Sequence, residues 1–141
     1  MYNKCKSVLL KNDLSELQRL NQIVTEFAKR HGLASELVFR LNLVLEEIIT
    51  NVISHGYKDG LQHEIAVRLF WKDPNMKVEV EDDGCPFNPL RAPPPDMGQP
   101  LTDRRVGGLG IHLVREMMDE LEYRRENDKN LLILKTKLRQ T

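Results

Sequence analysis

Three residues capable of chemistry recur at intervals of four in an otherwise apolar segment. In EEIITNVISHGY, residues 46–57, they are Glu47, Asn51 and His55. Because an α-helix turns by about 100° per residue, residues spaced by four lie along one edge of it. An Asn side-chain oxygen suits Mg²⁺, and a carboxylate one turn earlier could hold or deprotonate a nucleophile. The alternative is the ordinary polar shoulder of an amphipathic helix. The adjacent Glu46 is expected to face solvent.

A second candidate carboxylate stands where a strand is expected to end, in Glu81-Asp82-Asp83-Gly84. A glycine here permits a close approach of the backbone to another group. Asp82 could accept a hydrogen bond from an exocyclic amine, the feature that distinguishes adenine from guanine. A plain surface Asp-Gly turn is the competing interpretation.

A third signal is the run Gly107-Gly108-Leu109-Gly110 directly before a predicted helix. Glycines let backbone N–H groups crowd around phosphate oxygens, and a helix N-terminus adds a favourable partial charge. The run matches neither G-x-G-x-x-G after a strand nor a Walker A sequence, and helix starts often carry glycine. The preceding Arg104 and Arg105 would stabilise charge on a γ-phosphate, or else form a solvated pair.

Hydrophobic periodicity predicts the elements that must position these residues. A first helix is expected from a cap at Asn12 or Asp13 to His31-Gly32, and a second from a cap at Ser35 to about His55. A further helix follows the glycine run, and strands are expected at 6–10, 64–71, 77–81, 121–125 and 131–138. This order predicts an α+β fold: a two-layer sandwich with a mixed, mostly antiparallel sheet and helices on one face.

Composition narrows the class of protein. The chain has 141 residues, 21 basic and 21 acidic, which argues against non-specific binding of nucleic acid. Apolar runs are too short for a membrane span, and no secretory signal is apparent, so a cytoplasmic location is expected. Cys5 and Cys85 are expected to be unpaired thiols. Residues 83–107 hold six of the seven prolines and show no periodicity, which is typical of a functional or disordered loop.

The three signals together, in the order E-x-x-x-N, D-x-G, Pro-rich loop and G-G-x-G, carry far more weight than any one alone. On these residues the sequence resembles the GHKL ATPase superfamily, which has the Bergerat fold, and within it the small anti-sigma factor serine kinases of the RsbW type. The most specific stretches are LEEIITNVISHGY, DDGCPFNPLRAPPPD and RRVGGLGIHLVREMMDELEY. The resemblance runs from the first strand to Lys137, and implies one domain over residues 1–141 with an ATP lid at about 86–107.

The resemblance implies a role for each matching residue. Glu47 would be the catalytic base, assisted by Arg105, and Asn51 would hold a Mg²⁺ ion that bridges the ATP phosphates. Asp82 would bind the adenine amino group, with Gly84 allowing close approach. The remaining candidate nucleotide-binding residues are Pro86, Phe87, Arg104, Gly107, Gly108, Leu109, Gly110 and Ile111. His55 could donate to a phosphate, or else form a structural hydrogen bond beside Asn51. The sequence departs from the family pattern twice: Pro86 replaces the second glycine of D-x-G-x-G, and Asn130-Leu131-Leu132 replaces the last glycine/threonine element.

Partners also follow from the resemblance alone. Such proteins phosphorylate a serine on a small STAS-type antagonist and bind a sigma factor, usually as homodimers, with no direct contact to nucleic acid or membrane. The alternative is a non-catalytic ATP-binding module that only sequesters a partner. An isolated histidine-kinase catalytic domain fits less well, because the chain offers no dimerisation helix with a phosphoacceptor His and Glu46 stands where such domains carry His.

Overall fold

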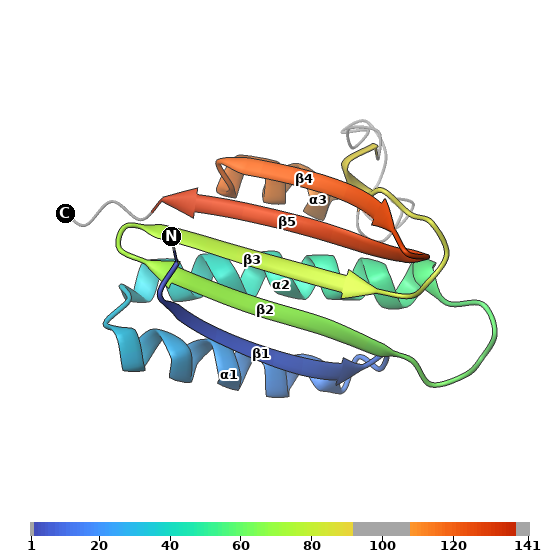
Figure 1. Cartoon of the computed structure of the whole chain (residues 1–141), viewed down its shortest axis with the longest axis horizontal. Helices are drawn as coiled ribbons and strands as arrows, with labels where there is room; N and C mark the ends of the chain where they lie inside the picture. Colours follow the sequence, from blue (N-terminus) through green and yellow to red (C-terminus); the bar gives the residue numbers. More distant parts are fainter. Residues whose placement is uncertain (1, 92–107, 138–141) are drawn as a thin grey trace.

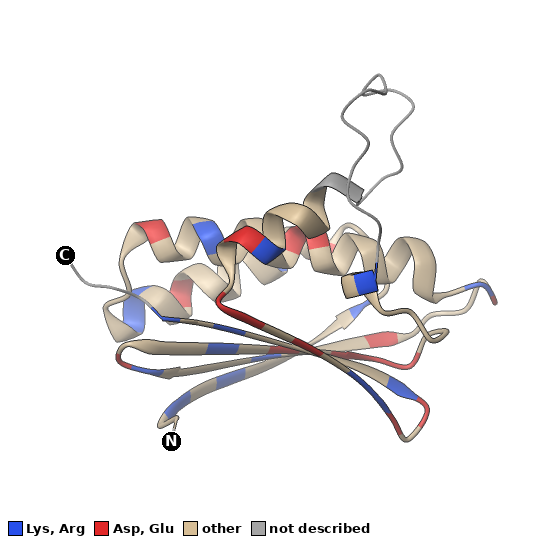
Figure 2. Cartoon of the chain, turned by 90° about the horizontal axis from the view of Figure 1, so that it is seen from above, with Lys and Arg blue, Asp and Glu red and all other residues tan. Residues whose placement is uncertain are grey.

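The computed structural model describes residues 2–91 and 108–137, and these form a single sheet covered by helices on one face (Figure 1). The sheet order is β1-β2-β3-β5-β4. Figure 2, turned by 90°, shows the helices together on one side of the sheet. The strands are β1 (Lys4–Lys11), β2 (Glu64–Lys72), β3 (Asn75–Asp82), β4 (Glu120–Glu126) and β5 (Lys129–Lys137). The predicted two-layer α+β sandwich is confirmed.

All strand pairings among the described residues are antiparallel, so the expectation of a mixed sheet is wrong in this detail. Two helices in succession separate β1 from β2. The second helix returns the chain to the end of the sheet at which β1 finishes. In the described part of the chain between β3 and β4 lie a short 3-10 helix (Pro89–Arg91) and one α-helix, and these two strands do run in the same direction. They do not pair, because β5 lies between them.

The two long helices lie close to their predicted positions but begin differently. Helix α1 (Glu16–His31) begins after a turn in which the Asp13 carboxylate accepts a bond from the Ser15 N–H at 3.0 Å, so Asp13 does not cap the helix. Gly32 ends it in the left-handed conformation, with φ of 69°. In α2 (Ser35–Gly56) Ser35 is the first helical residue and Ala34 occupies the cap position, so the predicted Ser35 cap is wrong.

The core lies between α2 and the sheet. Residues Leu41, Leu45 and Ile48 of α2 are at most 1% exposed, and they pack with equally buried residues of β2 and β3. The short helix α3 (Gly108–Met117) adds Ile111 and Val114 to the same core. Because α2 is fixed along its length by this packing, the polar residues on its edge have defined positions relative to β3 and β5.

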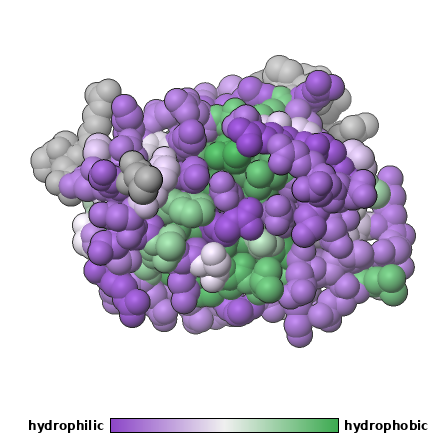
Figure 3. Space-filling model, in the orientation of Figure 1, coloured by the Kyte–Doolittle hydropathy of each residue, from purple (hydrophilic) through white to green (hydrophobic). Residues whose placement is uncertain are grey.

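The opposite face of the sheet carries no helix among the described residues. Figure 3 shows hydrophobic side chains on it, set among hydrophilic ones. Leu9 is exposed there, whereas Arg68 forms an ion pair with Glu79 at 2.9 Å. Within residues 2–91 and 108–137, we find no helix with the length and apolarity needed to cross a membrane.

Candidate active site

A pocket opens between the second half of α2 and the ends of β3 and β5. Its volume is about 380 Å³, including the mouth that is open to solvent. Two residues predicted to act on a nucleotide, Asn51 and Asp82, line it from opposite elements. Its remaining wall is mostly apolar, as expected for a site that binds a flat base. The other lining residues are Ile48, Val52, Gly56, Val80, Phe87, Pro89, Tyr123, Asn130 and Leu132.

Asp82 is the last residue of β3 and is only 5% exposed. One oxygen of its carboxylate, Oδ1, accepts bonds from the Gly84 N–H at 2.9 Å and from the Asn130 Nδ2 at 3.0 Å. Burial raises the pKa of this carboxyl above its ordinary value, while these two bonds and the charge of Arg125 oppose the rise. Asp82 is therefore a buried acceptor held in one orientation at the pocket wall.

Gly84 lies against the C-terminal end of α2. A β-carbon on Gly84 would stand 2.5 Å from the carbonyl oxygen of Gly56 and 2.9 Å from its carbon. The next residue, Cys85, donates its N–H to the same Gly56 oxygen at 2.7 Å. The predicted close approach at Gly84 thus exists, and the group that approaches is the backbone of α2.

Asn130 is a pocket residue that sequence reasoning missed. It is 5% exposed and stands directly opposite Asp82 in the β3–β5 pairing. In the sequence it marks only a departure from the family's glycine/threonine element. The one signal for it is a polar residue directly before the apolar run Leu131–Leu134, and that signal names no partner. Tyr123, which donates its hydroxyl to Asn130 Oδ1, was missed for the same reason.

Glu47 lies one turn before the pocket residue Asn51 on α2. Asn51 is 3% exposed and donates its Nδ2 to Glu47 Oε1 at 3.3 Å, while Glu47 itself is half-buried. Burial raises the pKa of Glu47, the bond from Asn51 lowers it, and the charge of exposed Glu46 adds a smaller rise. A carboxylate whose pKa is raised by burial holds a proton more readily than an exposed one, which suits it to accept a proton.

Helix α3 begins directly above Glu47. A β-carbon on Gly110 would overlap the carboxylate of Glu47, so a glycine is needed for this approach. Gly108 belongs to the first turn of the same helix, and Leu109 follows it. The structure therefore places Gly110 of the glycine-rich segment against Glu47, and the contact of these glycines with phosphates stays a prediction.

Other predicted residues are placed less centrally. His55 is exposed and stacks on Phe87, with ring centroids 5.1 Å apart, and Phe87 lines the pocket. Pro86 is exposed, and Ile111 is buried in the core, 4% exposed, where it packs with the sheet-facing residues. Arg104, Arg105 and Gly107 lie outside the described residues, as does most of the predicted lid.

The donor set fits a magnesium ion only in combination with a substrate. Among the described residues no group of three or more His, Cys, Asp or Glu side chains could hold a metal ion. Mg²⁺ bound with nucleotides takes one or two protein oxygens and completes its shell with phosphate oxygens and water. The Asn51 side chain, whose amide nitrogen is turned to Glu47, leaves its neutral oxygen for such a role.

The antiparallel sheet with helices on one face and the pocket at the C-terminal end of α2 are features of an ATPase domain of the histidine-kinase type. The family model of the histidine kinase-like ATPase domain matches residues 10–136. The chain therefore belongs to this family, and membership implies that ATP is the nucleotide it uses.

Individual relatives narrow the resemblance. The serine/threonine-protein kinase BtrW of Bordetella bronchiseptica is 31% identical over 109 residues, covering 76% of this chain and 75% of the relative. The serine-protein kinase RsbW of Listeria monocytogenes is 30% identical over 99 residues, covering 67% of this chain and 63% of that protein. The chain thus spans less than two thirds of the Listeria relative.

A solved structure has the same fold. It contains the RsbU and RsbW domains of Rv1364c from Mycobacterium tuberculosis, and the TM-score is 0.63 at 13% identity. The match covers 94% of this chain and 32% of that one, so the chain corresponds to about a third of the larger protein.

Proposed function

We propose that the protein is an ATP-dependent protein serine kinase that regulates an anti-sigma pathway. The observation that carries this proposal is the pocket lined by the amide of Asn51 and the buried acceptor Asp82, with the carboxylate of Glu47 hydrogen-bonded to Asn51. Relatives at about 30% identity are named serine-protein kinases, which supports the same activity here.

In the proposed reaction each residue has one task. The free oxygen of Asp82 accepts a hydrogen bond from the adenine amino group, and apolar residues of the pocket cover the ring. Asn51 would hold Mg²⁺, and the ion would neutralise charge on the phosphates. Glu47 accepts the proton of a serine hydroxyl as its oxygen bonds to the γ-phosphorus. The bond from that phosphorus to the β,γ-bridging oxygen breaks, and ADP leaves.

The proposed partners follow from the family resemblance. The acceptor serine belongs to a STAS-domain antagonist, and the second partner is a sigma factor that the kinase sequesters. We further propose a homodimer, for which the helix-free face of the sheet, with hydrophobic residues visible in Figure 3, offers a surface.

The test is the substitution Glu47→Gln, with Glu46→Gln as a matched control on the next, exposed residue. Glu47→Gln removes the base while keeping the size of the side chain, so transfer of radiolabelled phosphate to the cognate antagonist should fall by about 10²–10⁴-fold. Its affinity for Mg-ATP should stay within about threefold of wild type, because the lost interaction belongs to the transition state. Glu46→Gln should leave both quantities near wild type.

Two results would contradict parts of the proposal. Undiminished transfer by Glu47→Gln would reject Glu47 as the base. A wild-type protein that binds ATP and a sigma factor yet never phosphorylates an antagonist would instead be a non-catalytic sequestering module.

A further inference from the structure

The side chain of Asn130 uses its full hydrogen-bonding capacity at the wall of the pocket. Its Nδ2 donates to Asp82 Oδ1 at 3.0 Å and to the carbonyl oxygen of Cys85 at 2.9 Å. Its Oδ1 accepts from the Phe87 N–H at 3.3 Å and from the Tyr123 hydroxyl. A primary amide has two N–H groups and two acceptor lone pairs, so all four are occupied.

These partners fix which way the amide faces. A reversed amide would set its oxygen against the Asp82 carboxylate and the Cys85 carbonyl, two acceptors with nothing to donate. Its NH₂ group would then face the Phe87 N–H, which is also a donor. The side chain of Asn130 is therefore locked with its donors toward Asp82.

The consequence for Asp82 is a division of labour between its two oxygens. Within the described residues, the bonds from Gly84 and Asn130 both end on Oδ1. Asp82 lines the pocket, so Oδ2 is the oxygen left for a ligand. Because the carboxyl is buried and its ionised form is disfavoured there, donors to Oδ1 also help to keep it an acceptor.

We infer that Asn130 is the positioning residue that gives the pocket its preference for a 6-aminopurine, by holding Asp82 through Oδ1 so that Oδ2 receives the amino group. This inference rests on the proposed function, since it assigns a role within the same nucleotide site. Asn130 acts through Asp82, and its bonds to Cys85 and Phe87 fix its own orientation.

The experiment compares two nucleotides that differ only in this amino group: ATP and purine riboside triphosphate, which lacks it. Wild type should prefer ATP by about 10- to 100-fold, the value of a hydrogen bond to a charged group. Asn130→Thr and Asn130→Val form a matched pair of similar shape, and both suit a strand. The Thr hydroxyl can donate to Asp82, so this variant should keep most of the preference, whereas Asn130→Val should reduce it to about threefold or less.

A third variant adds a pH signature that a purely structural role would not show. Asn130→Asp keeps the acceptor for Tyr123 and Phe87 but places a second carboxyl against Asp82. At pH 8 the ATP preference should be lost, and it should return in part toward pH 6, because the new carboxyl can donate once it is protonated. Asn127→Asp, on the exposed turn of the same hairpin, controls for the added charge and should behave as wild type.

The outcomes separate this inference from the proposed function. If wild type binds ATP, two results would overturn the positioning role of Asn130. Asn130→Val could keep the wild-type preference, or it could lose affinity for both nucleotides equally. Wild type that binds neither nucleotide would overturn the proposed function and the inference with it. Affinity for purine riboside triphosphate, expected within about threefold of wild type in every variant, also reports that the pocket is folded.

Discussion

The two ends of the candidate site are built differently. The base end, which we define as Asp82, Gly84 and Asn130, is buried and joined by hydrogen bonds between β3 and β5 and by backbone contact with α2. The phosphate end, Glu47, Asn51 and Gly110, has one side-chain bond of 3.3 Å, and Glu47 is half-buried. In the proposed function, recognition of the base would thus be set by the fold, whereas the carboxylate of Glu47 would keep room to adjust when a substrate binds.

A β-carbon added at the phosphate end tests this difference through activity. In Gly110→Ala the new methyl group meets the flexible end of Glu47, which must move away. Phosphoryl transfer should fall by about 100-fold, because a displacement of about 1 Å in a catalytic group has this effect. The free energy of unfolding should stay constant or rise by up to about 1 kcal/mol, because Ala is the better helix former. Single-turnover transfer and urea unfolding measure the two quantities.

The same change at the base end should act mainly on stability. In Gly84→Ala the methyl group meets the Gly56 carbonyl, which is backbone and cannot rotate away. We expect the free energy of unfolding to fall by about 1–3 kcal/mol, measured by urea denaturation. If Gly84→Ala proved as stable as wild type, or if Gly110→Ala destabilised the fold more than Gly84→Ala, the contrast between the two ends would be wrong.

The sequence predicts residues whose placement depends on local patterns, but not those placed by the register of distant strands. Glu47, Asn51 and Asp82 could be selected as candidates because helix spacing and a strand end are local patterns, and the elements that carry them follow from hydrophobic periodicity. Asn130 was missed because its role depends on the register of β5 against β3, which sets it opposite Asp82 across a separation of 48 residues. The prediction that Ile111 binds nucleotide followed its neighbours in the motif, whereas its helical phase points it into the core.

A buried hydroxyl next to the base end offers a smaller test. Among the described residues, the Tyr57 hydroxyl is a buried polar atom without a hydrogen-bond partner. Burial, together with the charges of Asp82, Asp83 and Asp59, raises the pKa of Tyr57 well above its ordinary value. Tyr57→Phe removes an unsatisfied group, so the free energy of unfolding should rise by about 1 kcal/mol. Thermal unfolding measures this, and a loss of stability would indicate that the hydroxyl has a partner in solution.

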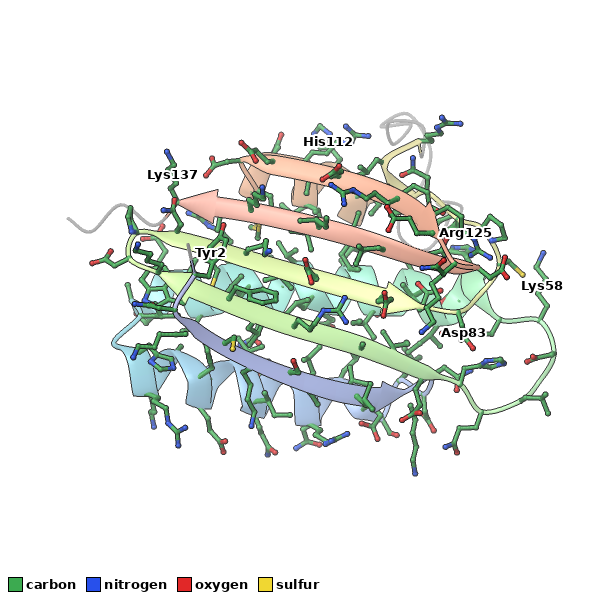
Figure 4. All side chains as sticks on the ribbon, in the orientation of Figure 1. Tyr2, Lys58, Asp83, His112, Arg125 and Lys137 are labelled. Carbon is green, nitrogen blue, oxygen red and sulfur yellow. The ribbon has the colours of Figure 1, made fainter. Side chains whose placement is uncertain are left out.

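The smallest expected effect concerns charge at the edge of the base end. Asp83, labelled in Figure 4 at the same end of the sheet as Arg125, faces the ring of His63. The two ring nitrogens of His63 lie 2.7 Å from an oxygen of Asp59 and 3.2 Å from an oxygen of Asp83, and both contacts raise the pKa of His63. The contact between His63 and Asp83 links the segment after α2 to the residue that follows Asp82.

The sign of the resulting pH dependence follows from that raised pKa. The imidazolium is favoured in the folded state, so its contribution to stability is fully present below the pKa of an unfolded His, about 6.5. It is lost as the pH rises through the higher pKa of folded His63. His63→Gln should therefore lower the melting temperature at pH 6 and match wild type more closely at pH 9. The effect should be small and weaker in high salt, because surface pairs are screened.

His112→Gln, which removes an exposed His paired with Glu116 on α3, is the control and should preserve this pH dependence. A gap between wild type and His63→Gln that widens with pH would show that the ring contributes to stability as a neutral group.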